Sequence, residues 1–179
     1  MQPRLIPAAL LTLATLAAVA SPTARAVDYY AGGDLAWVAV PVASTDFDSF
    51  AVKFRAGASL PSGWGVEIQT LFGLGDDSVG NLTLQTDNVT AAFIRYGTKP
   101  EYDTQFFALA GYATSSLSFS GSADTSGLDD SYSGFAFGFG LTEKLKWLPN
   151  TRAILELNSY FADDDVDVWA VSFGLQYDF

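Results

Sequence analysis

The eleven residues WAVSFGLQYDF, at positions 169–179, alternate strictly between two kinds of side chain. One parity is apolar and mostly large: Trp169, Val171, Phe173, Leu175, Tyr177 and Phe179. The other parity is small or polar: Ala170, Ser172, Gly174, Gln176 and Asp178. A period of two is the pattern of a β-strand with unlike faces. The segment therefore predicts a strand with one strongly apolar face, and the fold depends on what that face contacts.

The same alternation recurs along the chain, and no helical period competes with it. We predict eight strands, at about 28–39, 49–60, 64–74, 87–98, 104–119, 133–145, 151–161 and 167–179. Some breaks between them are short turns, at 60–64, 97–103 and 146–151. The other breaks collect acids among Gly, Ser, Thr and Asn, which is loop chemistry. These acids are Asp46, Asp48, Asp76, Asp77, Asp124, Asp129, Asp130, Asp163, Asp164, Asp165 and Asp167.

Two architectures produce such strands. In a soluble sandwich or lipocalin-like barrel the apolar face points inward, whereas in an outer-membrane barrel it faces lipid and the polar face fills the lumen. The polar face of the predicted strand 133–145 consists of Gly134, Ala136, Gly138 and Gly140. Water-exposed faces more often carry Lys, Glu and Thr, whereas a narrow lumen needs small residues. We therefore predict an all-β fold, a closed eight-stranded antiparallel transmembrane β-barrel.

Residues 1–26 predict an export signal that is removed. Arg4 precedes the apolar run at 5–20, and Ala24, Arg25 and Ala26 fit the A-x-A cleavage pattern. A membrane-anchoring helix is the alternative, but the run is shorter than the roughly 20 apolar residues of a spanning helix. We expect one outer-membrane barrel domain at 27–179.

Composition excludes several function classes. The chain has no histidine and no cysteine, so Ser–His and Cys–His catalysis, the common zinc sites and a disulfide framework are absent. The formal net charge of −11 becomes −13 once Arg4 and Arg25 are removed, which argues against nucleic acid as a partner. No paired-carboxylate site stands out from the loop acids. We therefore expect a protein that is not an enzyme and needs no cofactor.

The final strand resembles a known signal. Ser172, Gly174, Tyr177 and Phe179 match the C-terminal assembly signal of Gram-negative outer-membrane barrels. More loosely, DYYAGGDLAW (28–37) and FFALAGYATSSLSFSG (106–121) are similar to strands of the small outer-membrane β-barrel family that includes the OmpA transmembrane domain, OmpX and the opacity proteins. The resemblance implies a monomer in the outer membrane of a Gram-negative bacterium. It also implies insertion by the barrel assembly machinery and contact with outer-membrane lipid and lipopolysaccharide.

Eight strands enclose a lumen just wide enough for side chains to fill, which argues against a general porin. Strand parity places a set of charged residues inside: Asp34, Lys53, Arg55, Glu67, Arg95, Arg152 and Glu156. We expect Arg55 to pair with Glu67 across a hairpin and Arg152 to lie near Glu156. Buried charges need partners. A plug of salt bridges is the favoured interpretation, and a gated polar conduit is the alternative.

The loop acids are candidate ligands for Ca²⁺ or Mg²⁺, which would bridge them to lipopolysaccharide phosphates. Asp163, Asp164, Asp165 and Asp167 form the densest group, although solubilising charge is the simpler interpretation. Three function classes follow. The first is a structural or interaction barrel acting through acidic extracellular loops, in envelope integrity or adhesion. The second is a narrow channel or carrier for a small solute, and the third, least favoured, is a lipid-modifying outer-membrane enzyme.

Overall fold

The computed structural model describes residues 27–42, 45–74, 77–79, 82–121, 131–160 and 168–179. The predicted export signal, residues 1–26, lies outside them. The strands are β1 (Asp28–Val42), β2 (Thr45–Ser59), β3 (Trp64–Gly73), β4 (Asp77–Val79), β5 (Leu82–Gly97), β6 (Thr104–Gly121), β7 (Ser131–Lys144), β8 (Thr151–Tyr160) and β9 (Val168–Asp178). No helix in the described part of the chain is long and apolar enough to cross a membrane.

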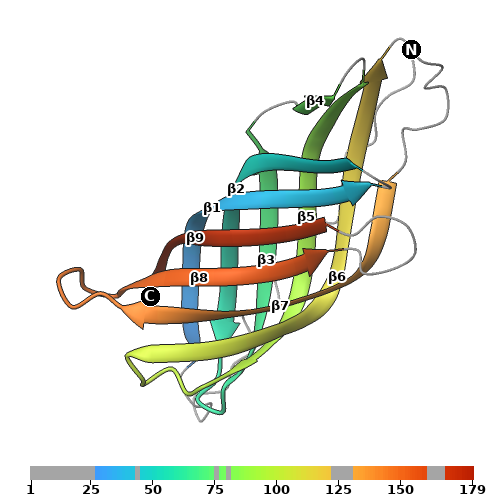
Figure 1. Ribbon diagram of the computed structural model, residues 1–179. Coiled ribbons are helices and arrows are strands. Elements are labelled where there is room, and N and C mark those ends of the chain that lie inside the picture. The colour runs from blue at the N-terminus through green and yellow to red at the C-terminus, as the bar shows by residue number, and fades with distance from the viewer. Residues whose placement is uncertain (1–26, 43–44, 75–76, 80–81, 122–130, 161–167) are drawn as a thin grey trace, which may run out of the picture.

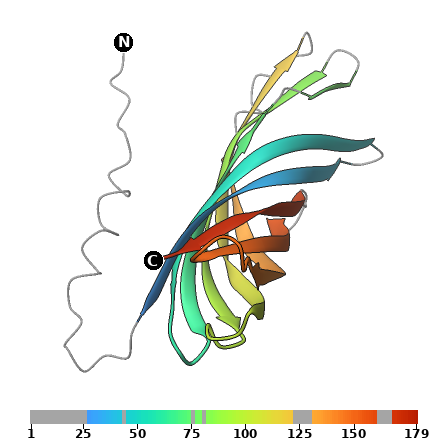
Figure 2. The ribbon, with the colours of Figure 1, turned by 90° about the vertical axis from the view of Figure 1, so that its left-hand side faces the viewer.

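The long strands close into a barrel. Every pairing is antiparallel, the strand order is β3-β2-β1-β9-β8-β7-β6-β5-β4, and β3 also pairs with β5. The eight long strands therefore form a ring, and β4 adds to the edge of β5 (Figures 1 and 2). The seam between the first and last strands runs from Tyr30 opposite Asp178 to Ala39 opposite Trp169. The predicted closed eight-stranded antiparallel barrel is confirmed.

The structure corrects two details at the end of the barrel where β1 leads into β2. Asp46 and Asp48, predicted in a connection, lie in β2 opposite Pro41 and Ala39 of β1. The three-residue strand β4 was also predicted as loop. Backbone hydrogen bonds hold both ribbons, and such pairing does not require alternating side chains. Sequence alternation therefore underestimated how far the strands continue.

The apolar faces of the strands point outward. Phe54, Phe139 and Phe173 are 54%, 60% and 62% exposed. Aromatic side chains also gather in two bands, one at each end of the exposed apolar wall. The first contains Tyr29, Trp64, Tyr96, Phe106, Tyr177 and Phe179, and the second contains Trp37, Phe50, Phe72, Tyr112, Phe135 and Trp169. This arrangement matches the lipid-facing surface and interfacial girdles of a transmembrane barrel.

The two ends of the barrel differ. At one end, here called the turn end, the chain reverses through 60–63, 98–103 and 145–150, and β1 begins and β9 ends there. Gly63 has φ 89° and donates its N–H to the Leu60 carbonyl at 2.9 Å, and Asn150 has φ 55°. Both residue types tolerate this left-handed backbone. The opposite end, here called the loop end, is where β1, β3, β6 and β8 end and where β2, β5, β7 and β9 begin.

Phe139→Arg tests the outward orientation, because Phe139 lies midway along β7 on its exposed face. The change should lower the free energy of unfolding by roughly 2–4 kcal/mol, the usual cost of a cation at the bilayer midplane. Urea titration of the barrel refolded in lipid vesicles measures this. The control is Trp147→Arg in the 145–150 turn, where the cost near an interface should be at most about 1 kcal/mol. Equal costs at both positions would contradict the lipid-facing assignment.

Candidate functional site

The most distinctive internal feature is a layer of charged side chains across the middle of the lumen, here called the charge network. It consists of Asp34 (β1), Lys53 and Arg55 (β2), Glu67 (β3) and Glu156 (β8). All five side chains have 0% relative exposure. Four of them lie on the consecutive strands β1, β2 and β3, whereas Glu156 comes from β8, so only the closed barrel brings Glu156 to the other four.

Arg55 is the centre of the charge network. Its Nη2 pairs with Asp34 Oδ2, while its Nη1 lies 2.5 Å from Glu156 Oε2 and 3.3 Å from Glu67 Oε1. Charge-assisted contacts of this kind are the strongest hydrogen bonds in proteins. One guanidinium therefore joins three carboxylates from three strands.

Lys53 forms the second junction and extends the charge network to the last strand. Its Nζ donates to Glu156 Oε1 at 2.8 Å and to Ser172 Oγ at 2.5 Å. The same ammonium lies 3.3 Å from Asp34 Oδ2 and 3.4 Å from Asn158 Oδ1. Because Ser172 is on β9 and Asp34 on β1, Lys53 links the two strands of the closing seam.

Glu67 collects donors on the side nearer the turn end. It accepts hydrogen bonds from the Tyr30 hydroxyl at 2.7 Å and from Gln69 Nε2 at 2.7 Å. Gln69 also donates to Glu156 Oε1 at 2.7 Å and accepts from the Tyr160 hydroxyl at 2.8 Å. Arg95 approaches Glu67 Oε2 at 3.6 Å. The carboxylates of the charge network therefore receive neutral donors as well as cations.

The structure buries all seven residues that strand parity places inside, and it brings Arg55 and Glu67 together. It corrects the proposed partner of Arg152. Arg152 and Glu156 are four residues apart on one strand, about 13 Å at the usual rise per residue, which is too far for a contact. Arg152 Nε instead lies 2.9 Å from Asp178 Oδ2. Its other nitrogens donate to the carbonyls of Pro100, Tyr102 and Asp103.

Asp178, a partly exposed acid at the turn end of the lumen, is a charged residue that the sequence analysis did not assign to the lumen. The predicted set has four cations but three acids, and Asp178 supplies the balancing carboxylate. A signal was present, because Asp178 shares the inward parity of Ser172, Gly174 and Gln176. The sequence analysis grouped it with these residues but did not count it among the lumen charges. With Asp178 included, the charges of the lumen balance.

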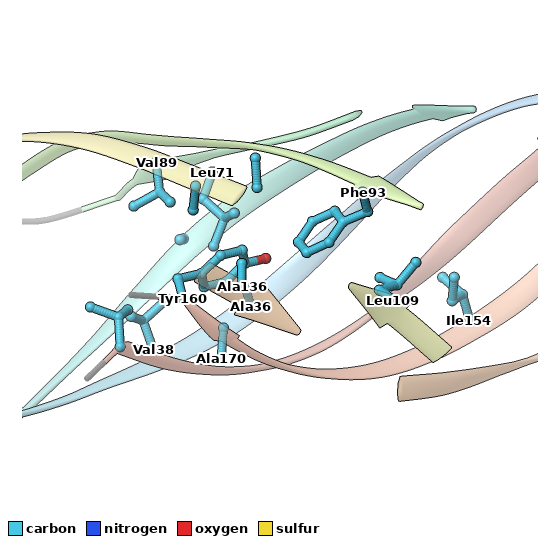
Figure 3. Packing of buried hydrophobic residues seen from close by; sticks show 14 of the residues in the cluster. Ala36, Val38, Leu71, Val89, Phe93, Leu109, Ala136, Ile154, Tyr160 and Ala170 are labelled. Carbon is cyan, nitrogen blue, oxygen red and sulfur yellow. The ribbon is translucent and has the colours of Figure 1, made fainter. Parts of the chain in front are cut away.

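The buried side chains described in the loop-end half of the lumen are mostly apolar, which the sequence analysis also missed. Its side chains are Ala36, Val38, Ala51, Leu71, Val89, Ala91, Ala113, Ala136, Tyr160, Val168 and Ala170, all buried. Figure 3 shows several of them directed into the space between the strands. Tyr160 packs toward Phe93, with ring centroids 6.4 Å apart, and its hydroxyl reaches the charge network. The sequence signal was the run of Ala and Val at inward parity beyond the charges.

The four residues of the proposed assembly signal divide between the two faces of β9. Ser172 is buried in the charge network, and Gly174 lies opposite Asp34 on the seam. Tyr177 and Phe179 point outward and are 46% and 78% exposed, with ring centroids 5.2 Å apart. A Cβ at Gly174 would lie 2.5 Å from the Cα of Asp34 and would also overlap the Gly33 carbonyl. Gly174 is therefore needed for β1 and β9 to pair.

No metal site is assigned. Asp163, Asp164, Asp165 and Asp167 lie outside the described residues. Within the described residues, no three acids, histidines or cysteines are grouped closely enough to hold a metal ion. Cation binding by the loop acids stays a prediction.

Arg55→Met should be strongly destabilising, by about 3–5 kcal/mol, because it leaves buried carboxylates without their shared cation. A double-mutant cycle with Glu67→Gln should give a coupling energy of about 0.5–3 kcal/mol. Urea unfolding in lipid vesicles measures all four proteins. The control is Lys99→Gln, whose exposed pair with Glu101 at 3.8 Å should contribute at most about 1 kcal/mol. Strict additivity of Arg55 and Glu67 would show that they do not interact.

Gly174→Ala and Phe179→Ala separate the structural from the recognition role of the terminal motif. Gly174→Ala should impair refolding of the purified protein, since the added methyl meets seam backbone. Phe179→Ala removes an exposed ring and should refold normally, yet it should reduce insertion in cells if the assembly machinery reads that ring. Heat-modifiable migration in gels measures refolding, and outer-membrane yield measures insertion. Normal cellular yield of Phe179→Ala would remove this residue from the signal.

Comparison with solved structures identifies barrels of the same fold. Ail, the attachment invasion locus protein of Yersinia pestis, in complex with the heparin analogue sucrose octasulfate, is 16% identical with a TM-score of 0.59, and the match covers 86% of this chain and 99% of Ail. OprG of Pseudomonas aeruginosa is 11% identical with a TM-score of 0.61, covering 87% and 97%. Neisserial surface protein A is 16% identical with a TM-score of 0.56, covering 84% and 97%. At these identities the likeness shows the fold alone.

A comparison with curated proteins gives no match. A family model does match, and it spans residues 7–179, nearly the whole chain. That model describes the outer membrane protein beta-barrel domain, the same architecture that the outward apolar wall and the closed strand ring define. The chain belongs to the outer membrane protein beta-barrel domain family.

Proposed function

We propose that this protein is an interaction barrel of the Gram-negative outer membrane, closed to solutes, that contacts cationic partners through acidic extracellular loops. The turn end would face the periplasm and the loop end the exterior, as in other outer-membrane barrels. Insertion by the barrel assembly machinery, contact with lipopolysaccharide and a monomeric state belong to the same proposal. The observation that carries it is the segregation of charge between the two ends and the lumen.

The lumen itself argues against passage of solutes. The charge network spans the barrel with fully buried side chains, and Arg55 and Lys53 tie β1, β3, β8 and β9 together. Opening it would separate buried ion pairs and leave charges without partners, at a cost of several kcal/mol. A function at the outer surface is therefore favoured over transport, because it does not require the charge network to open.

Charges outside the lumen are sorted by end. Of the lysines and arginines after residue 26, Lys53, Arg55, Arg95 and Arg152 are buried in the barrel. The remaining three, Lys99, Lys144 and Lys146, lie at the turn end. The sequences 74–81, 122–130 and 161–167 contain aspartates and neither lysine nor arginine. A surface of this composition attracts cations and repels polyanions.

The ligand of Ail helps to decide which class of partner suits the acidic loops of this chain. Ail was solved with sucrose octasulfate, a polyanionic heparin analogue. The loop-end connections of this chain offer no lysine or arginine to a sulfate. We therefore favour divalent cations that bridge the loops to lipopolysaccharide phosphates, which would support envelope integrity, over adhesion to sulfated polysaccharides.

A carrier for a small apolar solute is the second candidate. The loop-end half of the lumen favours it, because most of the buried side chains described there are Ala, Val and Leu. Planar-bilayer conductance and liposome uptake of an apolar solute would reveal it. A lipid-modifying enzyme is least supported, because a chain without histidine cannot provide Ser–His chemistry.

The test replaces Asp163, Asp164, Asp165 and Asp167 together by Asn. In cells lacking the native protein, the wild type should lower uptake of a hydrophobic fluorescent dye, and the Asn variant should not. Added Mg²⁺ should enhance the wild-type effect, because the loops would bind lipopolysaccharide only through the ion. The matched control is Glu101→Gln with Glu143→Gln, two exposed acids at the turn end. Equal protection by the Asn variant and the wild type would contradict the proposal.

A further inference from the structure

A cavity of about 350 Å³ opens at the turn end, on the side of the barrel opposite the loops. Its walls include Tyr30, Arg95, Gln105, Gln176, Pro61 and Pro100, and we call it the vestibule. The turns that contain Pro61 and Pro100 form part of its rim. Arg152 fixes the second turn by donating to the carbonyls of Pro100, Tyr102 and Asp103. The part of the rim that contains Pro100 is therefore held in place by hydrogen bonds.

Arg95 occupies the wall between the vestibule and the charge network. Its guanidinium carbon lies 4.0 Å from the centre of the Phe107 ring and 5.0 Å from that of Tyr30. Glycine provides the room for both rings. A Cβ at Gly140 would lie 2.7 Å from Phe107 Cζ, and one at Gly57 would overlap the Tyr30 ring. The two aromatic contacts hold the cation in place.

The hydrogen-bonding capacity of Arg95 is largely unused. Its one ion pair within the described chain is the 3.6 Å approach of Nη1 to Glu67 Oε2, an oxygen that already accepts from the Tyr30 hydroxyl. By contrast, Arg152 uses Nε, Nη1 and Nη2 in contacts of 2.9–3.1 Å. An arginine carries five N–H donors in a plane. A buried guanidinium with spare donors beside a cavity is suited to a bidentate oxyanion.

Glu67, on the inner side of Arg95, is shared with Arg55, and two acids near the vestibule have partners of their own. Asp178 is paired with Arg152 at 2.9 Å, and Glu101 lies 3.8 Å from Lys99. Asp28 is exposed to solvent at the lip. The inner wall thus presents the N–H donors of Arg95 beside the Tyr30 ring, while Pro61 and Pro100 supply apolar surface at the rim.

We propose that the vestibule binds the carboxylate of a small molecule with an apolar body, entering from the turn end. Arg95 would receive the carboxylate, and the rings and prolines would contact the apolar part. The volume is at the lower end of the range for small-molecule sites, which limits the ligand to roughly the size of one aromatic ring with its substituents. The site lies at the opposite end from the acidic loops, so it is independent of the function proposed above.

The test uses 4-fluorobenzoate as the probe, with 4-fluorobenzamide as its neutral counterpart. Fluorine NMR follows both with the full-length barrel refolded in detergent micelles, and with empty micelles to correct for partitioning. We expect saturable binding of the benzoate that unlabelled benzoate displaces, and no saturable binding of the benzamide. Benzamide binding as tightly as benzoate would overturn the proposal, because it would show that the cation is not involved.

Arg95→Gln should weaken benzoate binding about tenfold or more, in line with loss of a charge-assisted hydrogen bond. Glu67 would keep Tyr30, Gln69 and Arg55 as partners, so the barrel should still fold, although loss of one lumen cation should lower its stability. Heat-modifiable migration would show that it folds. Lys99→Gln, which removes a nearby cation outside the vestibule, should leave binding unchanged. Unaltered binding in a folded Arg95→Gln protein, or absence of saturable binding to the wild type, would refute the site. If Arg95→Gln does not fold, the benzoate–benzamide comparison on the wild type still decides.

Discussion

The contact between the Arg55 guanidinium and three carboxylates is the constraint on which the rest of the structure depends. Ion pairs without exposure to solvent are stable only when every charge has a partner. Asp34, Glu67 and Glu156 reach Arg55 from β1, β3 and β8, so the pairing is complete only when the sheet is curved into a ring. The charges of the lumen are therefore fully paired only when the barrel closes. The lipid-facing wall can remain mostly apolar because the charged side chains of the strands are paired inside the barrel.

Inside the barrel, large aromatic side chains pack against glycines of neighbouring strands. On the outer face, Phe and Trp are not limited by space. In the lumen, a large side chain fits only where a neighbouring strand has a residue without a side chain. Gly57 gives room to Tyr30, and Gly140 gives room to Phe107. The glycine-rich inward face of β7, which first favoured a membrane barrel over a soluble one, therefore has a packing role. Its Gly140 provides the volume in which the Phe107 ring beside Arg95 lies.

Period-two patterning was sufficient to predict the closed barrel and the inward direction of Lys53, Arg55 and Glu156. It did not predict partners. Arg152 pairs with Asp178 and not with Glu156 because of the pairing of β8 with β9 and the position of the 98–103 turn. Alternation within one strand encodes neither. Strand ends were also missed, as at β4 and the start of β2, because backbone pairing continues where side-chain alternation stops. The apolar loop-end half of the lumen was overlooked because Ala and Val are compatible with either face.

The position of Ser172 and Gly174 on the closing seam has a consequence for quality control of the protein. A chain that lacks β9, through truncated synthesis or proteolysis, would leave Lys53 without its Ser172 acceptor and β1 with an open edge. Such a fragment would also lack Asp178, the partner of Arg152, so we expect it to aggregate or be degraded rather than to insert into the membrane. The lumen contacts can therefore form in full only when β9 is present.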